Sequence, residues 1–335
     1  MPSPKTALVA LLPLVPQASA WGALGHNTVA YIAQQFLHKS TAHFAQSLLN
    51  DTSSNYLANI ATWADSFRST PEGAFSSPLH YIDAFDSPPE SCNVDYERDC
   101  PEEGCIISAL ANYTARVQQQ NVGFVERQRA LKWIVHFTGD VHQPLHVENL
   151  EVGGNLINVT FDGVVANLHR IWDSNIPEKL RGGFALEDAR IWAEELAGEI
   201  RNGTYAAVKE EWLEGIVASD AVETTMVWAR DANAYICSTV VPEGPEAVRH
   251  QELGGEYYKK AIPVVQQQIA KAGFRLAAWL NTIVTGEDCL GGKKAKPFGN
   301  KGPTIKKELA GWMVKARETR RDFGYDCGCT EEHHH

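Results

Sequence analysis

Two histidine–aspartate pairs, each spaced four residues apart in apolar sequence, constrain the fold of this chain more than any other feature. His136 and Asp140 lie in the apolar stretch 131–140, and His169 and Asp173 repeat the spacing. On a helix, residues four apart share one face, with Cβ atoms about 5–6 Å apart. Ionisable side chains on a core-facing helix are costly unless they are paired or bound to a metal. Each pair therefore indicates either a hydrogen-bonded couple or a metal site.

Further histidines and aspartates surround the two pairs. Asp65 and His80 precede them, and His146 ends the segment His142-Gln143-Pro144-Leu145-His146, in which Pro144 breaks the helix. Imidazole and carboxylate mixtures without cysteine are suitable zinc ligands, and an open coordination position makes such a site catalytic. Spacing alone leaves a metal centre and hydrogen-bonded pairs equally open.

The rest of the sequence predicts a mainly α-helical protein. Apolar residues recur near helical spacing in six segments, which are 28–36, 56–67, 127–141, 187–200, 221–235 and 256–284. The clearest exception is 156–161, followed by Asp162-Gly163 and then 164–168. A two-residue Asp-Gly turn between β-rich runs predicts a hairpin. The segment 85–105 is expected to be a long acidic loop with three cysteines.

The ends of the chain differ in character from its middle. Residues 1–20 resemble a secretory signal peptide, with Lys5, an apolar run over 7–15 and an Ala18-Ser19-Ala20 cleavage site. Residues 21–285 are then expected to form one domain. Residues 286–335 are interpreted as an extension, with a basic linker and a short amphipathic helix that either docks on the main core or binds a partner.

Charge and processing motifs limit the possible activities. The formal net charge is −11, which excludes a nucleic-acid binder that works through a polycationic groove. An anionic substrate would need a local source of positive charge, and a metal cluster is the obvious candidate. No apolar stretch is long enough to cross a membrane. Export also agrees with seven cysteines and with N-glycosylation sequons at Asn50, Asn112, Asn158 and Asn202.

Three motifs together resemble those of the fungal zinc-dependent single-strand-specific nucleases of the S1/P1 type. They are Trp21-Gly22-x-x-Gly25-His26, His136-x-x-x-Asp140-x-His142-Gln143-Pro144-Leu145-His146 and Asn167-Leu168-His169-x-Ile171-Trp172-Asp173. The resemblance runs from Trp21 to about residue 284. It implies a single helical domain of the zinc phospholipase C and nuclease type, with a small β-hairpin.

The resemblance also implies a centre of three zinc ions. Asp65, His80, His136 and Asp140 would hold the first ion, and His146, His169 and Asp173 the second. The third would be held by the free amine and carbonyl of Trp21 together with His26, and Asp140 would bridge it to the first. His142 is not a ligand in this family, so we interpret it as supporting the site or the fold.

Substrate-binding and structural residues follow from the same resemblance. Tyr81 would stack a base and Asp83 would accept a hydrogen bond from a base edge, while Arg68 and Asn175 would touch the phosphate; ordinary packing or solvation is the alternative for each. Disulfides are expected for Cys92–Cys237 and Cys100–Cys105, which leaves Cys289, Cys327 and Cys329 in the extension.

The implied activity is that of a secreted monomeric endonuclease. It would cleave the P–O3′ bond of single-stranded DNA and RNA to give 5′-phosphates, and would remove the phosphate of 3′-nucleotides. Two alternatives are a phosphodiesterase similar to zinc phospholipase C and a secreted zinc-binding protein that has lost catalysis.

Overall fold

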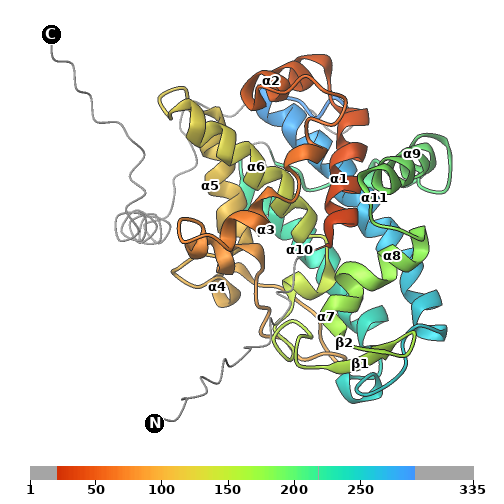
Figure 1. The fold of residues 1–335 in the computed structure, drawn as a ribbon. Helices are drawn as coiled ribbons and strands as arrows, with labels where there is room; N and C mark the ends of the chain where they lie inside the picture. Colours follow the sequence, from red (N-terminus) through yellow and green to blue (C-terminus); the bar gives the residue numbers. More distant parts are fainter. Residues whose placement is uncertain (1–20, 218, 291–335) are drawn as a thin grey trace, which may run out of the picture.

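The computed structural model describes residues 21–217 and 219–290, and helices dominate this part of the chain (Figure 1). The α-helices are α1 (Ala23–Phe36), α2 (Lys39–Leu49), α3 (Trp63–Arg68), α4 (Tyr96–Asp99), α5 (Ile106–Gln118), α6 (Phe124–Asp140), α7 (Leu168–Arg170), α8 (Ile176–Arg181), α9 (Leu186–Asn202), α10 (Ala221–Tyr235) and α11 (Glu256–Thr285). Shorter helical turns are η1 (Ala58–Ile60), η2 (Ala74–His80), η3 (Pro144–Val147), η4 (Ile171–Asn175), η5 (Glu211–Leu213), η6 (Ile236–Val240) and η7 (Pro245–Ala247). The predicted mainly α fold is confirmed.

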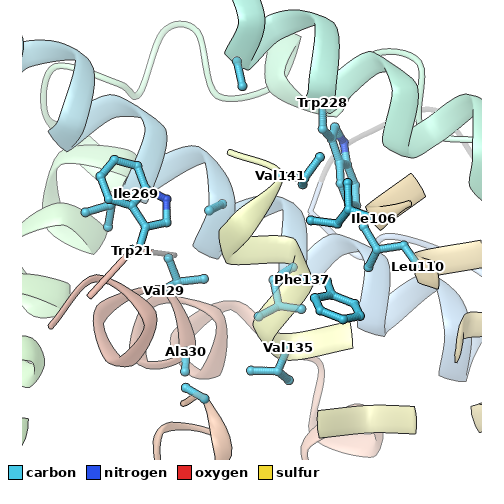
Figure 2. Packing of buried hydrophobic residues seen from close by; sticks show 14 of the residues in the cluster. Trp21, Val29, Ala30, Ile106, Leu110, Val135, Phe137, Val141, Trp228 and Ile269 are labelled. Atoms are coloured by element: carbon cyan, nitrogen blue, oxygen red, sulfur yellow. The ribbon is translucent and has the colours of Figure 1, made fainter. Parts of the chain in front are cut away.

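The core forms where the longest helices cross. Helix α1 packs against α11 and α9, and α5 packs against α6. Figure 2 shows Trp21 and Val29 beside Ile269 of α11, and Phe137 of α6 lies between this group and the side chains of α5 and α10. Trp21 is fully buried. The start of the domain is therefore part of its core, next to the C-terminal half of α6.

The sheet of the described chain is the predicted hairpin. Strand β1 (Asn158–Phe161) pairs antiparallel with β2 (Val164–Asn167). The turn residues Asp162 and Gly163 both have positive φ, at 51° and 77°, as a two-residue type I′ turn requires. The hairpin prediction is confirmed, with strands slightly shorter than the sequence pattern indicates.

The predicted helix over 56–67 is broken in the structure, and the break has a physical cause. Turns and η1 occupy its first half, and α3 begins only at Trp63. Between them, the carbonyl oxygen of Ala61 accepts a hydrogen bond from Nδ1 of His136 at 2.6 Å. A continuous helix would engage that carbonyl with its own backbone, so the interruption serves the orientation of His136.

Two disulfides fasten the acidic loop that precedes α5. Cys92 is bonded to Cys237 in η6, and Cys100 is bonded to Cys105 immediately before α5. These are the pairs that the family resemblance implies. Cys289 is exposed and forms no disulfide with another described residue.

Other expectations concern segments outside the described residues. They are the signal peptide over 1–20, the linker and amphipathic helix after residue 290, and Cys327 and Cys329. Among the helices that are described, none is both long and apolar enough to cross a membrane.

Candidate metal centre

Eight histidine and aspartate side chains expected to be metal ligands converge next to the C-terminal half of α6. They come from separate elements: His26 from α1, Asp65 from α3, His80 from η2, His136 and Asp140 from α6, His146 from η3, His169 from α7 and Asp173 from η4. We call these eight side chains the donor cluster. Their ligand atoms form three groups in which all atoms lie within 4.8 Å of one another: His26, Asp65 and His136; His80, His136 and Asp140; His146, His169 and Asp173.

Asp140 occupies the middle of the first part of the cluster. Its Oδ1 lies 3.0 Å from Nε2 of His26, and its Oδ2 lies 2.9 Å from Nδ1 of His80 and 3.3 Å from Nε2 of His136. Asp65 completes this part, with Oδ1 3.6 Å from Nε2 of His136. One carboxylate thus faces three imidazoles, which is the arrangement expected of a bridging ligand.

The second part of the cluster is built around Asp173. Its Oδ2 lies 3.1 Å from Nε2 of His169, and its Oδ1 lies 3.8 Å from Nε2 of His146. The two imidazole rings are 4.9 Å apart. All three side chains are buried, so their nitrogen and oxygen atoms face one another rather than bulk water.

Backbone carbonyl groups fix the orientation of three imidazoles. Nδ1 of His136 lies 2.6 Å from the carbonyl oxygen of Ala61, that of His146 lies 2.9 Å from the oxygen of His80, and that of His169 lies 2.6 Å from the oxygen of Gly153. When Nδ1 donates its proton in this way, Nε2 keeps a free lone pair. Metal-binding histidines are held by this same kind of hydrogen bond.

Close backbone approach also shapes the cluster. A Cβ on Gly139 of α6 would lie 2.8 Å from Nδ1 of His26, so glycine is what allows the His26 ring to lie against α6. At the start of the domain, the Gly22 N–H donates to the carbonyl oxygen of Asp173 at 2.8 Å. The backbone next to Trp21 is therefore attached directly to the second part of the donor cluster.

The donor cluster leaves buried polar atoms without hydrogen bonds, which tests whether a metal fits. Within the described chain, eight of its atoms on seven residues have no hydrogen-bond partner: both ring nitrogens of His26, Oδ1 of Asp65, Nε2 of His80, Nε2 of His136, Oδ1 of Asp140, Nε2 of His146 and Oδ2 of Asp173. The 3.0 Å contact between His26 and Asp140 is close but misaligned for a hydrogen bond. Buried polar groups without partners are costly, whereas imidazole and carboxylate atoms aimed at common points suit a transition metal such as zinc. The residues present therefore fit metal ions.

The charge state of the cluster is set by burial and by its carboxylates. Burial opposes a charge on His136, but Asp140 and Asp65 together raise the pKa of His136 to about 9. Burial also opposes the charge on Asp140, yet the neighbouring imidazoles, His136 first, hold its pKa well below the usual range. Burial lowers the pKa of His80 to about 4. Because a ligand nitrogen must lose its proton, metal binding here is linked to pH.

A cavity opens beside the cluster and contains three of the four expected substrate-binding residues. Arg68, Tyr81 and Asp83 line it together with His80, His146 and His169 of the donor cluster and with Leu145, Glu148, Val152, Gly153 and Asn155. Arg68 contacts Oδ1 of Asp65 at 3.2 Å. Asn175 is not among the lining residues, although it lies two residues after Asp173 and its Oδ1 is buried without a partner in the described structure.

Gln143 is a residue of the site that spacing arguments missed. It is fully buried, and its Nε2 donates to Oδ1 of Asp173 at 2.5 Å while its Oε1 accepts from the N–H of Leu145. Its own N–H donates to the carbonyl oxygen of Asp140. Its place inside the motif between His142 and His146 was the only signal available.

The remaining histidines and sequons are also placed by the structure. His142 turns away from the cluster, with Nδ1 2.7 Å from the oxygen of Thr138. His38, His43 and His250 are exposed, as expected for surface residues. Three sequon asparagines are exposed, whereas Asn112 is buried in α5.

Comparison with known proteins places these observations in context. The family described as S1/P1 nuclease matches residues 21–285. Nuclease S1 of Aspergillus oryzae is 52% identical over 276 residues, which cover 82% of this chain and 96% of that protein. Nuclease P1 of Penicillium citrinum is 50% identical over 263 residues, covering 78% and 97%. Endonuclease 2 of Arabidopsis thaliana is 33% identical over 292 residues, covering 82% and 93%.

Proposed function

This chain belongs to the S1/P1 nuclease family and is a metal-dependent hydrolytic nuclease, and on this premise we propose that it cuts single-stranded DNA and RNA with three zinc ions. The observation that carries the proposal is the donor cluster, in which buried ligand atoms lack hydrogen-bond partners beside a cavity. Imidazole and carboxylate donors without cysteine are typical of catalytic zinc sites.

The three ions would be shared among nine residues. Asp65, His80, His136 and Asp140 would hold the first ion, His146, His169 and Asp173 the second, and Trp21 and His26 the third together with Asp140. The geometry of Asp140 supports the bridge, because its two oxygens face different imidazoles. For Trp21, the support is that its side chain is fully buried and that the neighbouring Gly22 is bonded to Asp173.

Hydrolysis would break the P–O3′ bond of the substrate. When bound, zinc ions lower the pKa of a water molecule and stabilise the charge on phosphate oxygens. Arg68 lies in the cavity wall and would donate to a phosphate oxygen, with Asp65 holding the guanidinium in place at 3.2 Å. Asn175 would contact the same phosphate. The products would be a 5′-phosphate and a 3′-hydroxyl, and a 3′-nucleotide would lose its phosphate by the same displacement.

Selection of single strands would follow from the shape of the site. The imidazoles of the cluster are buried, so a backbone phosphate reaches them only if the adjacent bases are splayed out of a duplex. Tyr81 would stack on one such base and Asp83 would accept a hydrogen bond from its edge. The formal charge of −11 leaves little general attraction for duplex DNA, so affinity would come from the metal centre and from stacking.

The remaining parts of the proposal concern the state of the protein. We infer export through a signal peptide over 1–20, a catalytic domain over 21–285, an extension over 286–335, glycosylation at the three exposed sequons Asn50, Asn158 and Asn202, and a monomeric enzyme. The two disulfides agree with an oxidising compartment. Family membership favours the nuclease over an enzyme similar to phospholipase C, and all nine ligand positions carry the required residue types, which argues against a chain that has lost catalysis.

The test is hydrolysis of heat-denatured DNA compared with duplex DNA, before and after chelation and after zinc is restored. We expect about three zinc ions per chain, loss of activity on chelation, and 5′-phosphate ends on the products. His169→Gln should lower both zinc content and activity, while His43→Gln, at an exposed position on α2, should change neither. Equal cleavage of duplex and denatured DNA, or full activity without metal, would overturn the proposal.

A further inference from the structure

The segment that follows His80 leads from the cavity wall to an exposed aromatic ring. Residues 81–86 follow His80, and exposure alternates along them: Tyr81 is 39% exposed, Ile82 and Ala84 are buried, and Phe85 is 59% exposed. In an extended chain, side chains two and four residues apart point to the same side. Phe85 therefore faces the same side as Tyr81 and Asp83, which line the cavity.

The backbone that presents Phe85 is held at several points. The Phe85 N–H donates to Oδ1 of Asp99 at 3.1 Å, and Asp99 is almost fully buried and paired with Arg98. Closer to the cluster, the Ile82 N–H donates to the carbonyl oxygen of His146 at 3.0 Å, and the Tyr81 carbonyl accepts from the Ile106 N–H at 2.9 Å. The exposed ring is thus displayed from a fixed backbone.

The residues around Phe85 limit which group of a substrate can bind against its exposed ring. The ring makes no contact with another aromatic ring among the described residues, and the loop that follows it is rich in acidic side chains, among them Asp86, Glu90 and Asp95. Negative charge disfavours a phosphate group at this position. Stacking of a nucleobase on an aromatic ring needs no positive charge and does not depend on sequence.

We propose that Phe85 is a stacking subsite for a second base of the single strand, beyond the base held by Tyr81 and Asp83. Four residues of extended chain span about 13 Å, and a stacked strand advances about 3.4 Å per nucleotide. The base on Phe85 therefore belongs to a nucleotide a few positions from the one at Tyr81. This inference rests on the proposed function, because it requires a single-stranded substrate at the donor cluster.

The test separates long substrates from short ones. For Phe85→Ala, we expect the KM for a dodecathymidylate to rise about fivefold to a hundredfold, which corresponds to the loss of one stacked base. Hydrolysis of adenosine 3′-monophosphate should be unchanged, because this substrate does not reach residue 85. Phe85→Trp should restore the low KM, and its added fluorescence should be quenched by a phosphorothioate dodecathymidylate.

Phe184→Ala provides a matched control, since Phe184 is 67% exposed and lies between α8 and α9. It should leave both substrates unaffected. An unchanged KM for the oligonucleotide in Phe85→Ala would overturn the subsite, as would an equal loss on both substrates, which would indicate damage to the loop. A wild-type dimer that Phe85→Ala converts to monomers would assign the ring to an interface instead. A wild-type protein inactive on both substrates would refute the proposed function itself.

Discussion

Two polar regions lie next to the C-terminal end of α6, and they differ in whether their polar atoms have hydrogen-bond partners. In the donor cluster, several nitrogen and oxygen atoms lack hydrogen-bond partners. The other region, which we call the paired network, consists of His142, Asp231, Lys271 and Arg275. Lys271 lies 2.9 Å from both oxygens of Asp231, and Arg275 lies 2.8 Å from Asp231 and 3.1 Å from Nε2 of His142.

In the paired network, each charged group has hydrogen-bond partners within the protein. Arg275 also donates to the carbonyl oxygen of Trp212, and no buried atom of the four residues is left without a partner in the described structure. Burial, with the nearby Arg275 charge, lowers the pKa of His142 to about 3, so this imidazole stays neutral and accepts from Arg275. Buried polar groups by themselves therefore do not identify a functional site. What distinguishes the donor cluster is that most of its residues keep a buried ligand atom that faces other ligand atoms and has no hydrogen-bond partner in the described structure.

The largest expected contrast comes from the same substitution made in each region. Asp140→Asn should lower hydrolysis of denatured DNA by about a thousandfold or more, because a bridging carboxylate and the charge it compensates are lost. Asp231→Asn should retain the wild-type rate at a temperature at which it is folded. The comparison requires initial rates and zinc content for both variants. Near-normal turnover of Asp140→Asn with full zinc content would refute the bridging role.

A second test concerns the N-terminal amine, which can complete the donor cluster only if Trp21 is the first residue. An α-amine has a reference pKa of about 7.7–8.0 and must lose its proton to bind zinc, whereas a peptide nitrogen cannot serve. Protein that begins Gly-Trp21 should bind about two zinc ions and turn over at least about tenfold more slowly. The paired network should be unaffected, so thermal unfolding of the zinc-free proteins should coincide. Equal zinc stoichiometry and equal rates would show that the amine is not a ligand.

A third prediction concerns stability rather than rate. Asp231→Asn should lower the free energy of unfolding by about 3 kcal/mol, because Lys271 and Arg275 would keep buried charges without a carboxylate. Burial opposes the Asp231 charge, but Arg275 and Lys271 outweigh it and lower the pKa of Asp231 in the folded state. A lowered folded-state pKa stabilises the protein above the unfolded value and loses that effect as the pH falls.

Urea denaturation across pH tests this directly. The stability difference between wild type and Asp231→Asn should be greatest at neutral pH and should shrink below the ordinary aspartate pKa of 3.8. A difference that grows with acid would contradict the sign of this linkage.

The smallest predicted effect is a change in zinc affinity, and it is tested by substituting two buried glutamines. Gln143 donates to Asp173 of the donor cluster, and Gln268 donates to the carbonyl oxygen of His142 in the paired network at 2.9 Å. Gln143→Leu should weaken zinc binding by about tenfold to a hundredfold, as is typical when the partner of a ligand is removed. Gln268→Leu should lower stability and leave zinc affinity unchanged. Competition with a chromogenic chelator measures both affinities, and identical affinities for the two variants would remove Gln143 from the site.

Local patterns in the sequence predicted much of the fold. The Asp162-Gly163 turn located the hairpin, and periodicity predicted α10 with the bounds that the structure has. Helix α5 was not predicted, and in the structure it is buried on nearly all sides. The helical break at Ala61 could not be predicted either, because it depends on a contact with His136, 75 residues away.

In the donor cluster, too, some features could be predicted from the sequence and others could not. Spacing alone identified the pairs His136 with Asp140 and His169 with Asp173, but it left hydrogen-bonded couples as open as a metal centre. Assembly of all eight side chains was expected only from the family resemblance. Gln143 and the cavity residues Glu148 and Val152 escaped prediction because a single buried or exposed side chain has no periodic signature.

Asp99 accepts a hydrogen bond from the backbone N–H of Phe85, and two disulfides fasten the acidic loop. These links affect which positions of the segment can vary among such enzymes. Because hydrogen bonds to the main chain and covalent links define the path of this segment, the identities of the side chains at 81, 83 and 85 contribute little to its course. The side chains at these three positions can therefore be substituted without changing the path of the backbone. Libraries restricted to them offer a route to altered base preference without loss of folding.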